Sequence, residues 1–214
     1  MDAHKHTEIM KILIINGSLK KTTESNTYKI CELLDSKFKS FGVDSNITTL
    51  NEIEFVRGTD KHDDDLQPVL TEMLESDGIV FATPIWWGMH SSYIQSLIER
   101  MDYIDTWGTD NKFRPFYNKV FGVAVSGGGD GFQNIHGNLF SFANNFGFTI
   151  PPRCNLESTA QENVEQDEDT LKQVEQLCTN MYVYGSMVKA GTQQNSGSTR
   201  TNENTRICYN ARYC

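Results

Sequence analysis

The chain has 214 residues, of which 38% are hydrophobic, enough for one buried core and few for two large domains. Nineteen basic and 28 acidic side chains give a formal net charge of −9, which repels nucleic-acid phosphates and anionic lipid. No apolar stretch is long enough to cross a bilayer. We therefore expect a single domain that binds no nucleic acid and spans no membrane.

Five cysteines are scattered along the chain without a C-x-x-C pair or a Cys/His spacing typical of zinc or iron–sulfur sites. This pattern predicts reduced thiols and no bound metal. Residues 1–10 contain charged and polar side chains before any apolar run, so they lack the hydrophobic core of a secretion signal. Both features predict a cytoplasmic protein.

Short apolar runs alternate with segments of helical spacing. In chain order, the sequence predicts a strand at 11–17, a helix over 30–41, a strand at 44–50, a helix over 66–74, a strand at 78–84, a helix over 94–104, a strand at 119–127, a helix over 135–146, a strand at 148–154 and a helix over 171–188. Gly42 follows the first helical segment as its stop signal.

This alternation predicts an α/β fold in which a five-stranded parallel sheet carries helices on both faces, because right-handed crossovers place them there. The expected strand order is 2-1-3-4-5. Residues 11–189 would form the doubly wound domain, and residues 1–10 an N-terminal extension. Residues 190–214 are rich in Thr, Asn, Gln, Ser and Gly and predict a flexible polar tail.

The loop after the first expected strand runs directly into a helix and is rich in hydroxyl and amide groups. A phosphate could be held by the helix N–H groups and the side chains of Ser18, Ser25, Asn26 and Thr27. Lys20 or Lys21 would add charge. The loop matches neither a Walker A nor a G-x-G-x-x-G pattern, so a terminal monophosphate suits it better than a pyrophosphate. The alternative interpretation is an ordinary helix cap.

The loop after the third expected strand contains two adjacent tryptophans, Trp86 and Trp87, in the run Pro84, Ile85, Trp86, Trp87, Gly88 and Met89. Both rings cannot face the same core, so at least one lines a cavity or an interface. A flat tricyclic ring needs an apolar or aromatic wall of this kind. The alternative is one tryptophan in the core beside another in a dimer contact.

The loop after the fourth expected strand is glycine-rich and includes Ser126, Gly127, Gly128 and Gly129. Glycines let the backbone approach a ligand and adopt positive φ, and the loop N–H groups could meet the polar edge of a ring. The alternative is a flexible turn. In an open parallel sheet, the loops after strands one, three and four converge at the carboxyl edge, where ligands bind.

Two motifs resemble those of the NADPH-dependent FMN reductase family of flavodoxin-like proteins. They are Gly17-Ser18-Leu19-Lys20 with Ser25-Asn26-Thr27, and Thr83-Pro84-Ile85-Trp86-Trp87-Gly88. The resemblance covers about residues 10–189. It implies that Ser18, Lys20, Ser25, Asn26 and Thr27 hold the FMN phosphate, and that residues 84–89 and 126–129 border the ring. Lys20 replaces a frequent arginine and Trp86 a usual tyrosine, which affects the shape of the expected pocket.

By this resemblance, NADPH or NADH passes a hydride to bound FMN, which reduces a small acceptor such as a quinone or a flavin, and relatives are often homodimers or homotetramers. No side chain needs to act as acid or base. His90 and His136 lie near the second and third loops and could donate a proton, but a lone loop histidine is more often solvated, and we expect both to be merely solvated. One alternative is a flavodoxin-type electron carrier without a nicotinamide site; another is a relative that retains the fold but not the cofactor.

Overall fold

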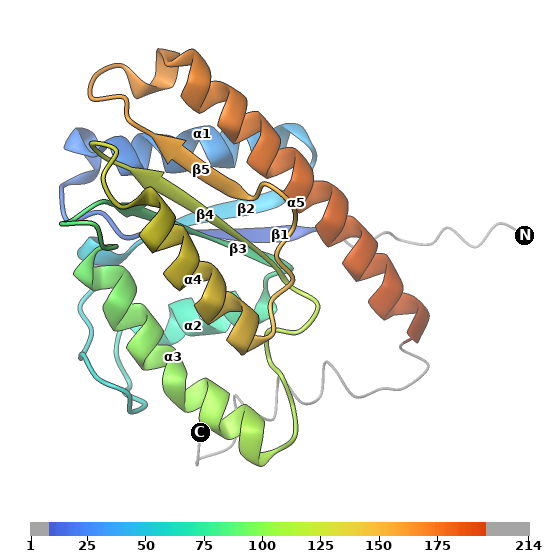
Figure 1. The fold of residues 1–214 in the computed structure, drawn as a ribbon. Helices are drawn as coiled ribbons and strands as arrows, with labels where there is room; N and C mark the ends of the chain where they lie inside the picture. Colours follow the sequence, from blue (N-terminus) through green and yellow to red (C-terminus); the bar gives the residue numbers. More distant parts are fainter. Residues whose placement is uncertain (1–8, 196–214) are drawn as a thin grey trace, which may run out of the picture.

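Five parallel strands form a sheet in the order β2-β1-β3-β4-β5, with helices on both faces (Figure 1). The computed structural model describes residues 9–195 of the chain, and side chains up to residue 191. The strands are β1 Lys11–Asn16, β2 Asp44–Thr49, β3 Gly78–Pro84, β4 Val120–Ser126 and β5 Asn155–Ser158. The helices are α1 Asn26–Ser40, α2 Leu66–Glu75, α3 Ser92–Asp110, α4 Phe132–Phe146 and α5 Glu168–Asn195. The predicted α/β class and strand order are confirmed.

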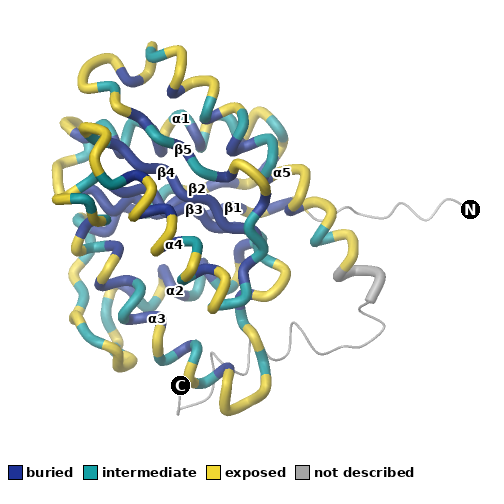
Figure 2. Tube along the Cα trace, in the orientation of Figure 1, coloured by how far each residue is buried: buried dark blue, intermediate teal, exposed yellow. Residues whose placement is uncertain are grey.

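The sheet separates two hydrophobic cores, because alternate side chains of each strand point to opposite faces. In β1, Leu13 and Ile15 belong to the core under α2, α3 and α4. Ile12 and Ile14 belong to the core under α1 and α5. Figure 2 shows the central strands β1, β3 and β4 buried along nearly their whole length and the helices exposed on their outer sides. Burial of these three strands on both faces explains why they appear in the sequence as nearly unbroken apolar runs.

The strand expected at 148–154 is wrong. Pro151 and Pro152 lie inside that run, and proline has no N–H to donate to a strand ladder. Thr149 makes only an isolated bridge to Val120, and the edge strand β5 begins after the prolines, at Asn155. Its inward side chains, which include Leu156, alternate with partly exposed ones.

Both ends of the described chain extend past the expected domain boundaries. Met10 is 6% exposed and packs against Gly185, so it belongs to the core and not to an extension. Helix α5 continues through residues 190–195, the start of the expected tail. Residues 1–8 and 196–214 lie outside the described residues. Over the part that the structure describes, no helix combines the length and apolarity needed to cross a membrane.

Candidate functional site

Three loops leave the carboxyl edge of the sheet from fixed positions, because the strand ladder continues one residue past each strand. Gly17 N–H donates to Ala82 O at 2.8 Å, and Ile85 N–H donates to Ser126 O at 2.9 Å. Gly127 N–H donates to the carbonyl at the end of β5, also at 2.9 Å. The structure therefore brings together the three loops that the sequence predicts to form one site.

Ser18 and Ser25 form a hydrogen-bonded pair at the N-terminus of α1. Ser25 Oγ accepts from Tyr28 N–H at 3.1 Å, which caps the helix, and its O–H donates to Ser18 Oγ at 2.7 Å. Lys20 N–H also donates to Ser18 Oγ, at 3.1 Å. Both acceptor positions of the Ser18 hydroxyl are thus occupied, so its own hydrogen remains to be donated.

The Ser18 hydrogen has no acceptor among the described residues, although the side chain is 2% exposed. The N–H groups of Asn26 and Thr27, in the first turn of α1, likewise have no acceptor within residues 9–195. Three donors at a helix N-terminus suit an anion, because the helix dipole favours negative charge there. This donor set fits a phosphate group.

The side chains of Asn26 and Thr27 are engaged elsewhere. Asn26 Nδ2 donates to Ala160 O at 3.1 Å and to Gln161 O at 3.0 Å, on the loop after β5. Thr27 Oγ1 lies 2.7 Å from Ser126 Oγ, and both hydroxyls are buried. These two side chains connect the loops to one another, so a phosphate would meet their backbone N–H groups.

Lys20 contributes to the loop through its backbone, while its side chain is exposed. Its carbonyl accepts from Asn51 Nδ2 at 2.7 Å. Its ammonium group can add charge near an anion only as a solvent-exposed group, which screening weakens.

Residues 86–89 form a tight hairpin after β3. Trp86 N–H donates to Met89 O at 2.8 Å, and Met89 N–H donates to Trp86 O at 3.0 Å. Trp87, with φ 50°, and Gly88, with φ 76°, form the turn between them, which is type I′. Trp86 is 47% exposed and Trp87 is 99% exposed. Neither tryptophan lies in the core.

The glycine loop after β4 packs against this hairpin. A Cβ at Gly131 would overlap the Gly88 backbone, and a Cβ at Gly127 would lie 2.9 Å from Ile85 Cβ. Asn134 Nδ2, from α4, donates to Gly88 O at 2.9 Å. By contrast, a Cβ added at Gly128 or Gly129 would have no neighbouring atom within 4 Å. One part of the loop is therefore closely packed and the other borders open space.

Of the remaining predicted ring contacts, Pro84 is the last residue of β3 and pairs in register with Ser126 of β4. Ile85 is half-buried and packs against the glycine loop, and Met89 is 44% exposed beside the tryptophans. The predicted ring-border residues thus lie at the ends of β3 and β4 or in the loops that follow these two strands. Their contact with a flavin remains a prediction.

A buried ion pair holds the loop after β2. Arg100, on α3, is fully buried and donates to Asp64 Oδ2 at 2.6 Å and to Val56 O at 2.8 Å. Burial alone would raise the pKa of Asp64, but hydrogen bonds from Arg100, Val56 N–H and Leu66 N–H outweigh it and hold that pKa below its ordinary value. The sequence analysis missed this pair; its only signal was one arginine on an otherwise apolar helix face.

The two histidines near the loops are packed, so the expectation that both are merely solvated is wrong for His136. Its Nδ1 lies 3.1 Å from Glu157 Oε1, and its ring is buried against Phe140. Burial lowers the pKa of His136, and the Glu157 carboxylate opposes that shift. His90 is half-buried, with Nε2 2.9 Å from Gln95 Oε1.

Three asparagines that the sequence analysis missed position the loops. Asn16 Oδ1 accepts from Ser18 N–H at 3.1 Å, and its Nδ2 donates to Thr49 Oγ1 at 3.3 Å. Asn51 and Asn134 hold the first and second loops, as described above. Asn16 could have been suspected, because an amide at the end of a fully buried strand needs partners. Asn51 and Asn134 belong to no sequence motif that would have marked them.

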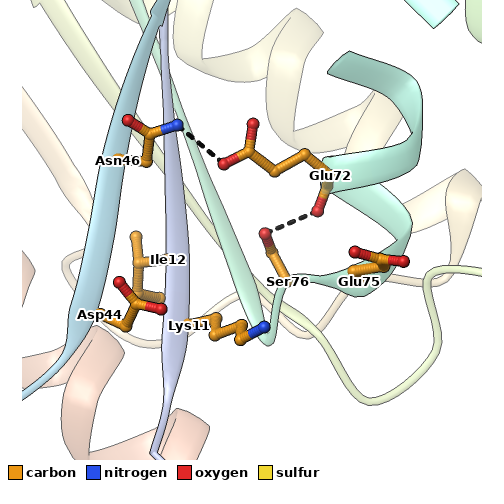
Figure 3. A pocket seen from close by; sticks show the side chains of 7 residues that line it. All are labelled: Lys11, Ile12, Asp44, Asn46, Glu72, Glu75 and Ser76. Carbon is orange, nitrogen blue, oxygen red and sulfur yellow. Dashed lines mark hydrogen bonds between the residues drawn. The ribbon is translucent and has the colours of Figure 1, made fainter. Parts of the chain in front are cut away.

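A hollow at the opposite, amino edge of the sheet does not suit a flavin (Figure 3). It is lined by Lys11, Ile12, Asp44, Asn46, Glu72, Glu75 and Ser76. Asn46 Nδ2 donates across it to Glu72 Oε1 at 2.8 Å. Three carboxylates and no aromatic wall would repel a phosphate and leave a ring without a stacking partner.

The strand order 2-1-3-4-5, with helices on both faces of the parallel sheet, defines a flavodoxin-like protein. The chain belongs to the NADPH-dependent FMN reductase family, whose sequence profile matches residues 10–162. This match confirms the resemblance seen in the motifs and supports FMN as the cofactor.

Two curated relatives are flavoproteins or act on a flavin. The 8-demethyl-8-aminoriboflavin-5'-phosphate synthase of Streptomyces davaonensis is 25% identical over 158 residues, 68% of this chain and 62% of the synthase. An iron–sulfur flavoprotein of Archaeoglobus fulgidus is 32% identical over 100 residues, 42% of this chain and 48% of that protein. The match thus spans less than two thirds of either relative. Within residues 9–195, no group of three His, Cys, Asp or Glu side chains is placed to hold a metal ion.

Solved structures share the fold. RosB, with a bound 8-demethyl-8-formylriboflavin-5'-phosphate, has a TM-score of 0.73 at 20% identity, over 94% of this chain and 86% of RosB. The apo form of the NADH:FMN oxidoreductase EmoB has a TM-score of 0.62 at 15% identity, over 81% and 89% of the two chains. An archaeal flavodoxin has a TM-score of 0.57 at 13% identity, over 84% and 99%.

Proposed function

We propose that the protein is an FMN-dependent oxidoreductase that passes two electrons from NADPH or NADH to a small acceptor such as a quinone or a flavin. The nicotinamide is oxidised by loss of a hydride, and a proton from water completes reduction of the acceptor. Bound FMN would supply the hydride-transfer chemistry. The observation that carries the proposal is the buried Ser18 hydroxyl, whose hydrogen is free at the N-terminus of α1.

The protein would position the cofactor and adjust its electrostatic surroundings. The Ser18 O–H and the N–H groups of Asn26 and Thr27 would hold the phosphate, and the hairpin 86–89 and the glycine loop 127–129 would border the ring. We further propose that the enzyme acts in the cytoplasm as a homodimer or homotetramer. No side chain of the site is assigned as a general acid or base.

Absorption spectroscopy of the purified protein tests this function. We expect flavin bands, either as purified or after addition of FMN, that bleach within seconds when NADPH or NADH is added without oxygen. Bands that persist with both nicotinamides would instead favour a flavodoxin-type electron carrier. A protein that stays colourless and does not take up FMN would disprove the cofactor assignment.

A second function, modification of the flavin itself, is favoured by the synthase relative and by the similarity to RosB. In that case FMN would be the substrate, and its ring would change during turnover. Mass spectrometry of the extracted flavin after incubation of the holoprotein with O2 and an amino donor, which oxidation and amination of a ring substituent would require, separates the two proposals. An unchanged FMN mass supports the oxidoreductase, and a changed mass supports flavin modification.

A further inference from the structure

The edge strand β2 leaves backbone groups unpaired along the outer side of the sheet. Asp44 N–H donates to Met10 O at 2.9 Å, which sets the ladder between β1 and β2. Because alternate residues of an edge strand turn their N–H and C=O groups away from the neighbouring strand, those of Ser45 and Ile47 face outward. Within residues 9–195, these outward groups have no hydrogen-bond partner. β2 also lacks the lysine or proline that commonly blocks such an edge.

The opposite edge of the sheet is closed by a side chain. On β5, Glu157 N–H donates to Gln173 Oε1 at 2.9 Å, and Gln173 Nε2 donates to Glu157 O at 2.8 Å. The Gln173 amide, on α5, thus takes the place of a neighbouring strand at Glu157. No side chain of the described residues does the same for Ser45 and Ile47, so β2 is the edge at which an extended segment could pair.

The two sides of the sheet beside β2 differ in chemistry. On the α1 side, Ile47 is half-buried and packs against the core under α1 and α5. On the α2 side, the carboxylates of Asp44, Glu72 and Glu75 line the hollow shown in Figure 3. The lining of this hollow contains one basic side chain, Lys11. A strand added to this edge would therefore be favoured by an apolar face toward α1 and a basic face toward α2.

Residues 205–214 have this pattern. In a chain with a net charge of −9, this segment contains Arg206 and Arg212 and no acidic residue, unlike the polar run before it. Both arginines fall on the same face of an extended segment, because side chains alternate between faces. The opposite face would carry Thr205, Ile207, Tyr209, Ala211 and Tyr213. Alternation with β-branched and aromatic residues on one face is typical of a half-buried strand.

Helix α5 ends close enough to the free edge to supply this strand. Lys189 Nζ donates to Asp77 Oδ2 at 2.7 Å and to Ile9 O at 3.0 Å, just before β3 and β1 begin. A strand beyond β2 would lie three strand spacings from β3, or about 14 Å. Residues 196–204 can span about 30 Å when extended, so the chain can reach this position.

The connection would also have the usual handedness. Helix α1 connects β1 to β2, toward the free edge, and α5 packs on the same face of the sheet as α1. A crossover from β5 through α5 to a strand beside β2 runs in the same direction over the same face. It therefore has the same hand as the β1–α1–β2 unit, and right-handed crossovers are the rule for parallel strands.

We propose that residues 205–214 add a sixth strand to the free edge of β2 in the same chain, parallel to it. Arg206 and Arg212 face the acidic hollow, and Ile207 and Tyr209 lie on the side of α1. The β2 strand of a second copy would bring another Asp44 and no basic side chain, so the charges favour the chain's own segment. The added strand pairs the outward groups of β2 and closes the edge.

Hydrogen exchange measured by NMR tests this docking. Removal of residues 205–214 should accelerate exchange of the Ser45 and Ile47 amides at least about tenfold, because their hydrogen bonds to the added strand are lost. The Leu13 amide, in the central strand β1, should keep its rate. A synthetic peptide of residues 205–214 added to the shortened chain should restore the protection. The same peptide with Arg206→Glu and Arg212→Glu should not.

Glu72→Lys in the 214-residue chain reverses a charge in the hollow and should accelerate exchange of the same two amides. In the shortened chain, this substitution should have no further effect. Asp102→Lys, at an exposed position on α3, is the matched control and should leave their exchange unchanged.

Equal exchange of the Ser45 and Ile47 amides in the 214-residue and shortened chains would overturn the proposal. Sedimentation velocity identifies the other occupants of the edge. A dimer that becomes a monomer on removal of residues 205–214 would overturn docking within one chain in favour of exchange of the segment between two copies. A dimer that persists in the shortened chain, with both amides still protected, would assign the edge to the β2 strand of a second copy.

Discussion

Thr27 Oγ1 lies 2.7 Å from Ser126 Oγ, although the two residues are 99 positions apart in the sequence. The bond joins the first turn of α1 to the last residue of β4. It therefore connects the loop proposed to hold a phosphate with the loop proposed to border a ring. Both hydroxyls are buried and satisfy each other, so their role is to fix the distance between the two parts of the site.

Replacement of Thr27 by valine should destabilise the protein. Valine keeps the shape of the side chain but leaves the Ser126 hydroxyl buried without this partner, at a cost of about 1 to 2 kcal/mol in the free energy of unfolding. Urea denaturation measures the loss. Thr27→Ser retains the hydroxyl and should restore most of the stability, whereas a serine variant as unstable as the valine variant would indicate that the methyl group, and not the bond, matters.

Ser18→Ala should weaken the binding of FMN while leaving riboflavin, which has no phosphate, unaffected. The serine would donate a hydrogen bond to a charged oxygen, and loss of such a bond costs about 1.5 to 3 kcal/mol, or about a 10- to 100-fold increase in Kd. Fluorescence titration of the apoprotein with each flavin gives the two constants. Ser36→Ala, an exposed position on α1, is the control. An equal loss of affinity for both flavins would mean that Ser18 does not hold the phosphate.

The fold was predictable because its signals are local and repeated. Four of the five strands are found where the sequence predicts them, three of these in apolar runs, and Gly42, with φ 75°, follows α1 as the predicted stop. The failure at β5 has a different cause. Asn155–Ser158 is a four-residue edge strand with only two inward side chains, so its apolar signal is weaker than that of the Phe148–Cys154 run before it.

The sequence predicts which loops form the candidate site, but not which groups in them are free to bind a ligand. Sequence spacing places Ser18, Asn26 and Thr27 at one helix N-terminus, but it does not reveal which of their groups are already engaged. That depends on distant partners, such as the Ala160 carbonyl that accepts from Asn26 and the Ser126 hydroxyl that pairs with Thr27. Contacts between residues 99 and 134 positions apart leave no periodic trace in a single sequence.

Gly131→Ala should disturb the packing between the hairpin and the glycine loop. Gly131 has a φ of 101°, and a Cβ there would overlap the backbone of Gly88. We expect a loss of about 2 kcal/mol or more in the free energy of unfolding, from backbone strain and displacement of the hairpin. Urea denaturation measures the loss, and increased proteolysis after Trp86 or Trp87 would report movement of the hairpin.

Gly137→Ala provides the matched control for that substitution. Gly137 lies on the exposed side of α4, and a Cβ added there would have no neighbouring atom within 4 Å. Alanine in a helix interior is favoured over glycine by about 0.5 to 1 kcal/mol, so this variant should be more stable than the wild type. If both glycine variants had the same effect, close packing between the loops would not be the cause.

Asp64→Asn should remove part of the acid sensitivity of the protein. The pKa of Asp64 is held below its ordinary value of 3.8, mainly by Arg100, so the carboxylate stabilises the fold fully above that value and loses its effect as the pH falls further. The substitution leaves the buried Arg100 without its counter-charge, which costs about 3 kcal/mol at pH 7. Urea denaturation between pH 7 and pH 3 should therefore show a lower but flatter stability profile.

Asp63→Asn is the control for this titration, because Asp63 is exposed and adjacent in sequence. Its profile should follow that of the wild type at every pH. If Asp64→Asn lost stability on acidification as steeply as the wild type, other carboxylates would dominate the acid response. The Arg100–Asp64 pair would then hold the loop after β2 without linking its stability to pH.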